Sequence, residues 1–182
     1  MENLVCSFFG HRNVEVTEEL KQKVKEVIEN LIVNHNVLNF LIGSCSNFNK
    51  LCHSVVTELK EKYLQIKRIA YTYSSENCNL ENERLKWEEI YSFSLKREIH
   101  LLGVEEQHKT RYTAGRASYV ERNKSMINDS DYCIFYYDES YKPELRKYSK
   151  RSVCYYQPKS GTQIAYNYAK QKRKIIINLM PT

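Results

Sequence analysis

Short apolar runs alternate along the chain with longer stretches in which apolar residues recur at helical spacing. The runs occupy residues 4–9, 38–44, 66–73, 99–103, 132–138 and 174–179, and continuous runs of this length are typical of strands covered on both faces. Helical spacing is found from Thr17 onward and at residues 47–63, 116–128 and 161–172. This alternation predicts an α/β fold, a Rossmann-like three-layer sandwich with a mainly parallel sheet and helices on both faces.

The helical pattern is clear in the first helix and weak in residues 74–97. Thr17 is placed to cap the helix, and Glu18 and Glu19 suit its positive end. Residues 74–97 mix turn residues with a polar helical piece around the only tryptophan, Trp87, and predict a loop with a short helix. The apolar stripe of the first helix consists of Leu20, Val24, Val27, Ile28 and Leu31.

Length and composition bound the class of protein. The 182 residues suit a single domain that spans residues 1–182. No apolar run approaches the roughly 20 residues of a membrane helix, and the N-terminus has an acid where a signal peptide has basic residues. We therefore predict a cytoplasmic protein with no membrane partner. The 6 cysteines form no CxxC pair and no histidine lies at finger-like spacing from them, so we predict free thiols, no metal site and no cofactor.

The positive charge is concentrated in one segment. The chain has a formal net charge of +6, and between Lys142 and Lys159 six basic residues stand against one acid, Glu144, which gives +5. The rest of the chain is close to neutral, so a broad nucleic-acid surface is not favoured.

The loops that follow the predicted strands are where chemistry is expected. Ligands of open parallel sheets bind at the carboxyl ends of the strands, near the point where the strand order reverses. The glycine-containing loop at residues 43–49 matches neither GxGxxG nor the P-loop pattern. The loops are Gly10-His11-Arg12, Gly43-Ser44-Cys45-Ser46-Asn47, the loop before Arg116, and Lys159-Ser160-Gly161-Thr162.

Two of these loops are candidate phosphate sites. Gly161 and Thr162 open a helix, where backbone N–H groups and the helix dipole favour an anion, and Lys159 adds a positive charge. A simple helix cap is the alternative interpretation. The loop at residues 43–49 is the second candidate, for a phosphate or a ribose.

Arg122 belongs to the helix predicted at residues 116–128. It shares one face with Met126, whereas Asn123 lies on another, so one side of the helix can pack while the other points to a ligand. A guanidinium suits bidentate binding of a phosphate. A salt bridge with Asp129 or Glu121 is the alternative.

His11 and Arg12 follow the first predicted strand. A histidine in such a loop is a ligand contact or, more often, a structural hydrogen-bonding residue, and we assign it no catalytic role. No Ser/His/Asp order, pair of carboxylates or metal cluster stands out in the sequence.

Four segments, "SFFGHRN", "LIGSCSNFNKLCHSVVTELKEKY", "GRASYVERNKSMINDSDYCIFYYDESY" and "QPKSGTQIAYNYAKQKRKIIINL", follow a recognisable order. The order is strand, GHR, a strand ending in glycine, a helix with ERN and Met, an apolar strand, and SGT opening a helix. In this order the chain resembles the YpsA-like branch of the SLOG superfamily, whose relatives include DprA and the LOG phosphoribohydrolases. The resemblance implies a Rossmann-like fold that binds a nucleotide or nucleotide-derived ligand at those strand ends.

The same resemblance bears on catalysis. LOG enzymes release a base from a nucleoside monophosphate with an arginine of an ERKxxM-like helix and a glutamate in PGGxGTxxE. Here Glu121, Arg122, Asn123 and Met126 match the first part. The second part departs, because Pro158 precedes a turn one residue short and Ala165 stands where the glutamate is expected. A methyl group cannot act as a general base, so Arg122 and Glu121 are catalytic candidates only if the protein is an enzyme.

Compared with YpsA-like chains, residues 139–159 are a basic, tyrosine-rich insertion. Four tyrosines interleave with basic residues, which suits a lid over an anionic ligand or a contact for nucleic acid. A solvated surface excursion is the alternative.

The leading hypothesis is a stand-alone domain that binds a nucleotide-like small molecule, as a sensor or by sequestering it, and that forms a homo-oligomer as such relatives often do. The alternatives are a phosphoribohydrolase, or another N-glycosidic hydrolase, acting on nucleoside monophosphates, and DprA-like nucleic-acid binding. The expected ligand contacts are Arg122, Asn123 and the Ser160-Gly161-Thr162 turn for phosphate, Gly10 and Gly43 for backbone approach, Arg12, Arg116 and Lys159 for charge, and His11, Ser44 and Asn47.

Overall fold

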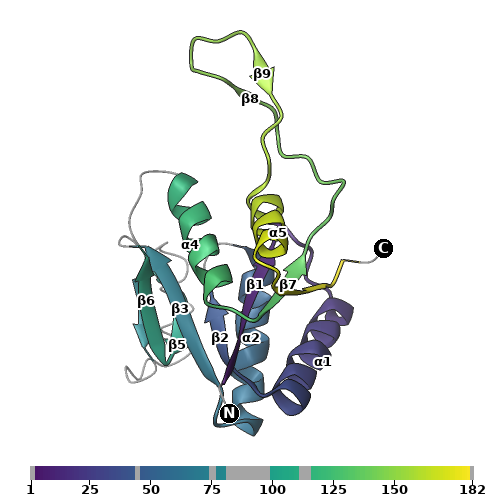
Figure 1. Ribbon diagram of the computed structural model, residues 1–182, viewed down its shortest axis with the longest axis vertical. Helices are drawn as coiled ribbons and strands as arrows, with labels where there is room; N and C mark the ends of the chain where they lie inside the picture. Colours follow the sequence, from purple (N-terminus) through teal and green to yellow (C-terminus); the bar gives the residue numbers. More distant parts are fainter. Residues whose placement is uncertain (1–2, 44–45, 74–76, 81–98, 111–115, 181–182) are drawn as a thin grey trace.

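The computed structural model describes residues 3–43, 46–73, 77–80, 99–110 and 116–180 (Figure 1). Within these residues, six strands form one sheet in the order β10-β7-β1-β2-β3-β6, and every neighbouring pair runs parallel. The loop and short helix predicted around Trp87 lie, apart from residues 77–80, outside the described part of the chain. The strands are β1 (Leu4–Gly10), β2 (Val37–Ile42), β3 (Lys67–Tyr73), β6 (Glu106–Thr110), β7 (Tyr132–Tyr136) and β10 (Ile175–Asn178).

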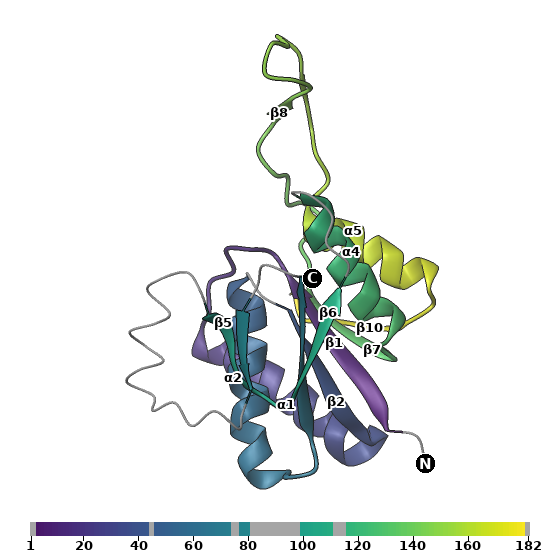
Figure 2. The same cartoon turned by 90° about the vertical axis from the view of Figure 1, so that its left-hand side faces the viewer.

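Helices cover both faces of this sheet (Figures 1 and 2). On one face lie α1 (Glu18–His35) and α2 (Asn47–Lys62), and on the other lie α4 (Arg116–Asn128) and α5 (Gly161–Gln171). The predicted Rossmann-like three-layer sandwich is therefore confirmed.

The two faces of the sheet carry separate apolar cores, because successive side chains of a strand point to opposite faces. Phe8 stacks with Phe40 on the side of α1 and α2, at 6.1 Å between ring centroids. Phe9 stacks with Phe135 on the side of α4 and α5, at 5.0 Å. Strand β1, which supplies Phe8 to one core and Phe9 to the other, is thus covered on each face, as continuous apolar runs predict.

The first helix follows its predicted pattern. The Thr17 hydroxyl accepts a hydrogen bond from the backbone N–H of Leu20 at 3.1 Å, which caps the helix. At the other end, Asn36 adopts a left-handed conformation with a φ of 53°, which asparagine tolerates better than most residues. The residues buried along the stripe are Leu20, Val24, Ile28, Leu31 and Ile32.

The fourth predicted strand, at residues 99–103, is confirmed as a strand, but it does not belong to the main sheet. The apolar segment at residues 99–103 falls in β5 (Ile99–Val104), which pairs with β4 (Asn77–Leu80) in a separate two-stranded parallel sheet. The edge of the main sheet is formed instead by β6, a polar segment in which the sequence pattern predicts no strand. Polar contacts hold β6 there: Gln107 donates to the Thr72 hydroxyl at 2.8 Å, and Lys67 pairs with Glu106 at 2.8 Å.

The strand predicted at residues 132–138 ends two residues early, at Tyr136. The backbone N–H of Tyr137 donates to Asn178 Oδ1 at 3.0 Å, and that of Asp138 donates to His11 Nε2 at 3.1 Å. Side chains from the end of β10 and from the loop after β1 therefore accept the backbone hydrogen bonds where the ladder stops. The helices predicted at residues 116–128, 47–63 and 161–172 match α4, α2 and α5 to within one residue.

Residues 139–159, which we call the arm, project from the body of the molecule (Figures 1 and 2). Near its far end the arm forms a two-stranded antiparallel ladder, β8 (Arg146–Lys147) with β9 (Tyr155–Tyr156). At the near end, the Gln157 side-chain amide donates to the carbonyl oxygen of Pro143. The arm is therefore a hairpin whose two strands are hydrogen-bonded to each other, and it extends away from the body.

Candidate functional site

The order in which successive strands are added to the sheet reverses between β1 and β7. From β1 the chain proceeds through β2 and β3 toward one edge, whereas β7 and β10 lie on the other side of β1. In open parallel sheets the crevice at such a point, outside the carboxyl ends of the strands, is the usual ligand site. The loops that begin at Gly10 and Asp138 lie there, because Gly10 is the register partner of Tyr136.

His11 joins these two loops. Its Nε2 accepts the hydrogen bond from Asp138, so the ring proton of the neutral imidazole lies on Nδ1. Burial lowers the pKa of His11, which keeps the ring neutral and suited to accepting this bond. The ring also lies 4.2 Å, between centroids, from that of Tyr141 at the start of the arm. The structure thus gives His11 the hydrogen-bonding role that we weighed against ligand contact.

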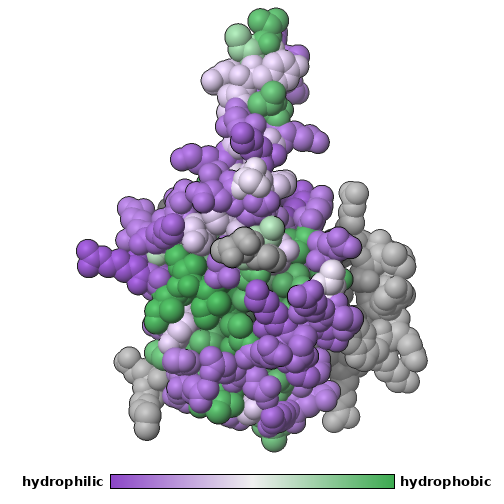
Figure 3. Space-filling model, turned by 90° about the vertical axis from the view of Figure 1, so that its right-hand side faces the viewer, coloured by the Kyte–Doolittle hydropathy of each residue, from purple (hydrophilic) through white to green (hydrophobic). Residues whose placement is uncertain are grey.

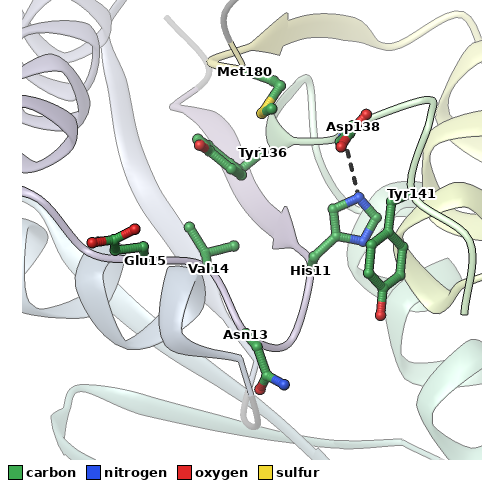
Figure 4. Close-up of a pocket in the computed structure, with 8 residues that line it drawn as sticks. All are labelled: His11, Asn13, Val14, Glu15, Tyr136, Asp138, Tyr141 and Met180. Carbon is green, nitrogen blue, oxygen red and sulfur yellow. Dashed lines mark hydrogen bonds between the residues drawn. The ribbon is translucent and has the colours of Figure 1, made fainter.

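A cavity of about 270 Å³ opens beside His11 (Figure 4). Its walls come from the loop after β1, from β7 and the segment that follows it, and from Met180 beyond β10. Glu15 and Asp138 give this cavity an acidic character, so it does not suit a phosphate. The lining residues are His11, Asn13, Val14, Glu15, Tyr136, Asp138, Tyr141 and Met180.

Arg122 lies on the opposite face of the sheet, on the buried side of α4. Only 3% of the residue is exposed. A Cβ placed on Gly43, just beyond the end of β2, would stand 3.5 Å from Arg122 Nε and 3.3 Å from Met126 Sδ. Arg122 Cζ lies 5.5 Å from the centroid of the Tyr119 ring. The predicted pairing of Arg122 and Met126 on one helix face is therefore present, with Gly43 directly against it.

Ser118 continues this face of α4 toward the carboxyl ends of the strands. It lies one helical turn before Arg122, it is 2% exposed, and its hydroxyl has no hydrogen-bond partner within the described residues. A buried hydroxyl without a partner costs free energy, and a ligand atom is one way to satisfy it. The buried face of α4 is therefore polar at Ser118 and Arg122 and apolar at Met126. Because Ser118 precedes Arg122 by one helical turn, helical spacing in the sequence would have placed the two residues on the same face.

The first turn of α5 supplies the other predicted anion site. Ser160 caps the helix through its hydroxyl, which accepts from the Gln163 backbone N–H at 3.0 Å. Thr162 is buried, whereas Gly161 is exposed and a Cβ there would meet no atom within 4 Å. Lys159 is also exposed, next to this turn. The cap that we gave as an alternative is present, and the space outside Gly161 remains open to a ligand.

Of the other predicted ligand contacts, some have structural roles and some lie at the surface. Gly10 is required by the core, since a Cβ there would lie 2.5 Å from Phe48 Cβ. Asn47 donates from its side chain to the Val14 carbonyl at 3.4 Å and from its backbone to that of Arg12 at 3.1 Å, which ties two loops together. The Arg12 side chain is exposed, Asn123 is half-buried and Arg116 begins α4. Ser44 lies outside the described residues.

Glu121 does not join Arg122 in one site. Its side chain is exposed, and its carboxylate pairs with Lys124 at 3.2 Å. Asp129, the other acid that we considered beside Arg122, accepts a hydrogen bond from the Tyr71 hydroxyl at 2.9 Å, and burial raises the pKa of that tyrosine. Ala165 is buried in the core of α4 and α5. The described residues include no group of three or more His, Cys, Asp or Glu side chains that could hold a metal ion.

The fold defines a Rossmann-like α/β protein, and a cavity lies beside the ends of its central strands β1 and β7. No family model matches the chain. The chain is similar to an uncharacterized SPbeta prophage-derived protein, YoqJ, of Bacillus subtilis (strain 168), with 28% identity over 160 residues that cover 84% of this chain and 81% of YoqJ. That description states no activity, so the comparison assigns none to the site. Among the described helices, none has both the length and the apolar character needed to cross a bilayer.

Proposed function

We propose that the protein binds a nucleotide or nucleotide-derived ligand at the carboxyl ends of its parallel strands, as a sensor or by sequestering the ligand. The observation that carries the proposal is the buried Arg122 guanidinium, which is 3% exposed and lies against Gly43 at a strand end. A guanidinium at a strand end presents N–H donors in the geometry that suits bidentate contact with a phosphate.

Two further features support an anionic ligand. Ser118 adds a hydroxyl donor one turn from Arg122 on the same face. Helix α5 begins at the same end of the sheet as α4 and packs beside it (Figure 2), with open space outside Gly161. Backbone N–H groups and the helix dipole favour a phosphate at this turn. The resemblance to the YpsA-like branch of the SLOG superfamily points to the same class of ligand.

Binding rather than cleavage is the function that these residues favour. Glu121 is exposed and paired with Lys124, and Ala165 supplies no carboxylate. A hydrolase needs a carboxylate or an equivalent base at the reacting sugar. Release of free base from nucleoside monophosphates at enzyme-like rates would contradict the binding proposal.

The test is native mass spectrometry of the purified protein, followed by calorimetric titration with nucleoside mono-, di- and triphosphates. We expect a bound nucleotide, and we expect Arg122→Ala to lower its affinity at least about tenfold, since hydrogen bonds to charged groups contribute roughly 1.5–3 kcal/mol. Arg122→Lys keeps the charge but not the bidentate geometry, so its loss should be smaller. Arg151→Ala on the arm is the control and should bind as the wild type does. Unchanged affinity in a folded Arg122→Ala protein would contradict the role of Arg122.

A further inference from the structure

The arm and α5 share the positive charge of this protein. Residues 139–174 contain ten basic residues and two acidic ones, a net +8, whereas the remainder of the chain contains 18 basic and 20 acidic residues, a net −2. The positive charge of the protein is therefore concentrated in residues 139–174. A strongly basic segment of this kind attracts an anionic polymer at long range.

Exposed tyrosines accompany this charge along the arm. Tyr148 is 71% exposed and Tyr155 is 55% exposed, and the ring of Tyr148 lies 5.0 Å from that of Tyr156. Lys147 Nζ lies 5.4 Å from the centroid of the Tyr155 ring. The arm surface is mainly hydrophilic with small apolar areas (Figure 3). Aromatic faces beside basic side chains are what unstacked bases and their phosphates require.

Lysines also lie beside tyrosine rings on the body, where Tyr166 and Tyr168 are partly buried. Lys170 Nζ lies 4.6 Å from the centroid of the Tyr166 ring, and Lys172 Nζ lies 5.5 Å from that of Tyr168. Between α4 and α5 an open cavity of about 220 Å³ is lined by Lys124, Lys159 and Tyr168, among others. Because Lys159 is the last residue of the arm, this cavity connects the arm to α5.

We propose that the arm and the outer face of α4 and α5 form a binding surface for single-stranded nucleic acid. Phosphates pair with the lysines and arginines, while bases stack on the exposed tyrosines. The charges favour a nucleic acid over a second copy of this chain as the ligand of this surface. Outside residues 139–174 a second copy carries a net charge of only −2, which does not match the +8 of this segment. The interleaving of tyrosine with basic residues favours a strand with accessible bases over a membrane surface. The residues of this surface varied in the tests below lie on the arm and are not among those that we propose for nucleotide binding, so either proposal can fail alone.

The first test measures affinity by fluorescence anisotropy, with an end-labelled oligothymidylate of about 16 nucleotides. We expect Lys147→Gln/Lys150→Gln to weaken binding at least about fivefold, because each exposed cation contributes to counterion release. The matched control is Lys21→Gln/Lys50→Gln, which removes the same charge from α1 and α2 on the opposite face and should change affinity less than about twofold. With Arg146 and Arg151 also changed to Gln, the slope of log affinity against log salt should fall in magnitude by about 3.

A second test separates stacking from charge. Tyr148→Phe keeps an aromatic face and should retain affinity, whereas Tyr148→Leu keeps apolar area but cannot stack and should lose at least about fivefold. Tyr148 is exposed on the arm, so these variants keep the fold, which circular dichroism checks. No binding by the wild type at low salt would overturn the proposal. So would equal losses in the arm and control variants, or binding to phosphatidylserine vesicles without binding to the oligonucleotide.

Discussion

The side chain of Phe48 fills the space that a side chain at Gly10 would occupy. A Cβ on Gly10 would lie 2.5 Å from Phe48 Cβ and 2.7 Å from its Cγ, which is closer than such atoms approach. Phe48 is fully buried and lies 5.7 Å, between centroids, from the ring of Tyr136. The glycine at the end of β1 therefore lets the first turn of α2 pack against the sheet, with Phe48 beside Tyr136 of β7.

The variant Gly10→Ala should consequently destabilise the protein. We expect a loss of about 1–3 kcal/mol in the free energy of unfolding, the range seen when a packed core is overfilled. Gly43→Ala is the matched control, because its Cβ would meet only Met126 at 3.3 Å and Arg122 at 3.5 Å, and it should cost less than Gly10→Ala. Urea denaturation measures both. If Phe48 is the cause, Gly10→Ala should cost less in a Phe48→Gly background, which removes the Cβ together with the ring, and additive losses would contradict this explanation.

The pH dependence of stability should follow His53 on α2. Burial, followed by the nearby charge of Arg68, lowers the pKa of His53 to about 4, from an ordinary value of 6.5. The unfolded chain therefore takes up this proton more readily than the folded chain. Stability is complete above about pH 6.5 and is lost as the pH falls toward 4, by about 2 kcal/mol at pH 5. The lowered pKa of His11 acts in the same direction.

Urea denaturation of the wild type and of His53→Gln at about pH 7.5 and about pH 5 tests this expectation. Glutamine cannot take up the proton, so the variant should lose about 2 kcal/mol less than the wild type over that interval. The comparison uses the change with pH rather than the stability at one pH, so any packing cost of the variant cancels. Equal losses in the two proteins would show that other groups control the acid response.

The central strands and the helices were predictable because burial on both faces leaves a strong apolar signal. β6 was not, since its residues are polar and its place depends on contacts that become visible only in three dimensions. Arg68, 3% exposed, pairs with Glu105 at 2.8 Å, and Glu105 also pairs with Lys60 at 3.0 Å. These contacts fix the chain just before β6 against β3 and α2. The apolar segment at residues 99–103 does form a strand, β5, but the apolar pattern does not show that it belongs to a separate sheet.

The candidate site was predictable in part for a related reason. Spacing along one helix placed Arg122 with Met126, and strand ends located Gly43 and the turn at Ser160. Spacing does not show that Phe48 packs on Gly10, that Asn47 ties two loops, or that Asp138 donates to His11, because these contacts join distant parts of the chain. Ser118 lay within reach of the helical pattern, but its burial depends on the sheet beneath it.

Ser118 offers a test in which stability and ligand affinity should change in opposite ways. Its hydroxyl is buried without a hydrogen-bond partner in the described part of the chain. Ser118→Ala removes that unsatisfied group, so the free energy of unfolding without ligand should stay the same or rise by up to about 1 kcal/mol. If the hydroxyl donates to a bound phosphate, the same variant should weaken nucleotide affinity by about five- to tenfold, from a lost hydrogen bond of roughly 1–1.5 kcal/mol.

Ser125→Ala, on the same helix and only partly buried, is the control and should leave affinity unchanged. Urea denaturation and calorimetry on the same samples measure the two quantities. A variant with unchanged affinity would exclude Ser118 from the site, and one that loses stability would show that the hydroxyl already has a structural partner.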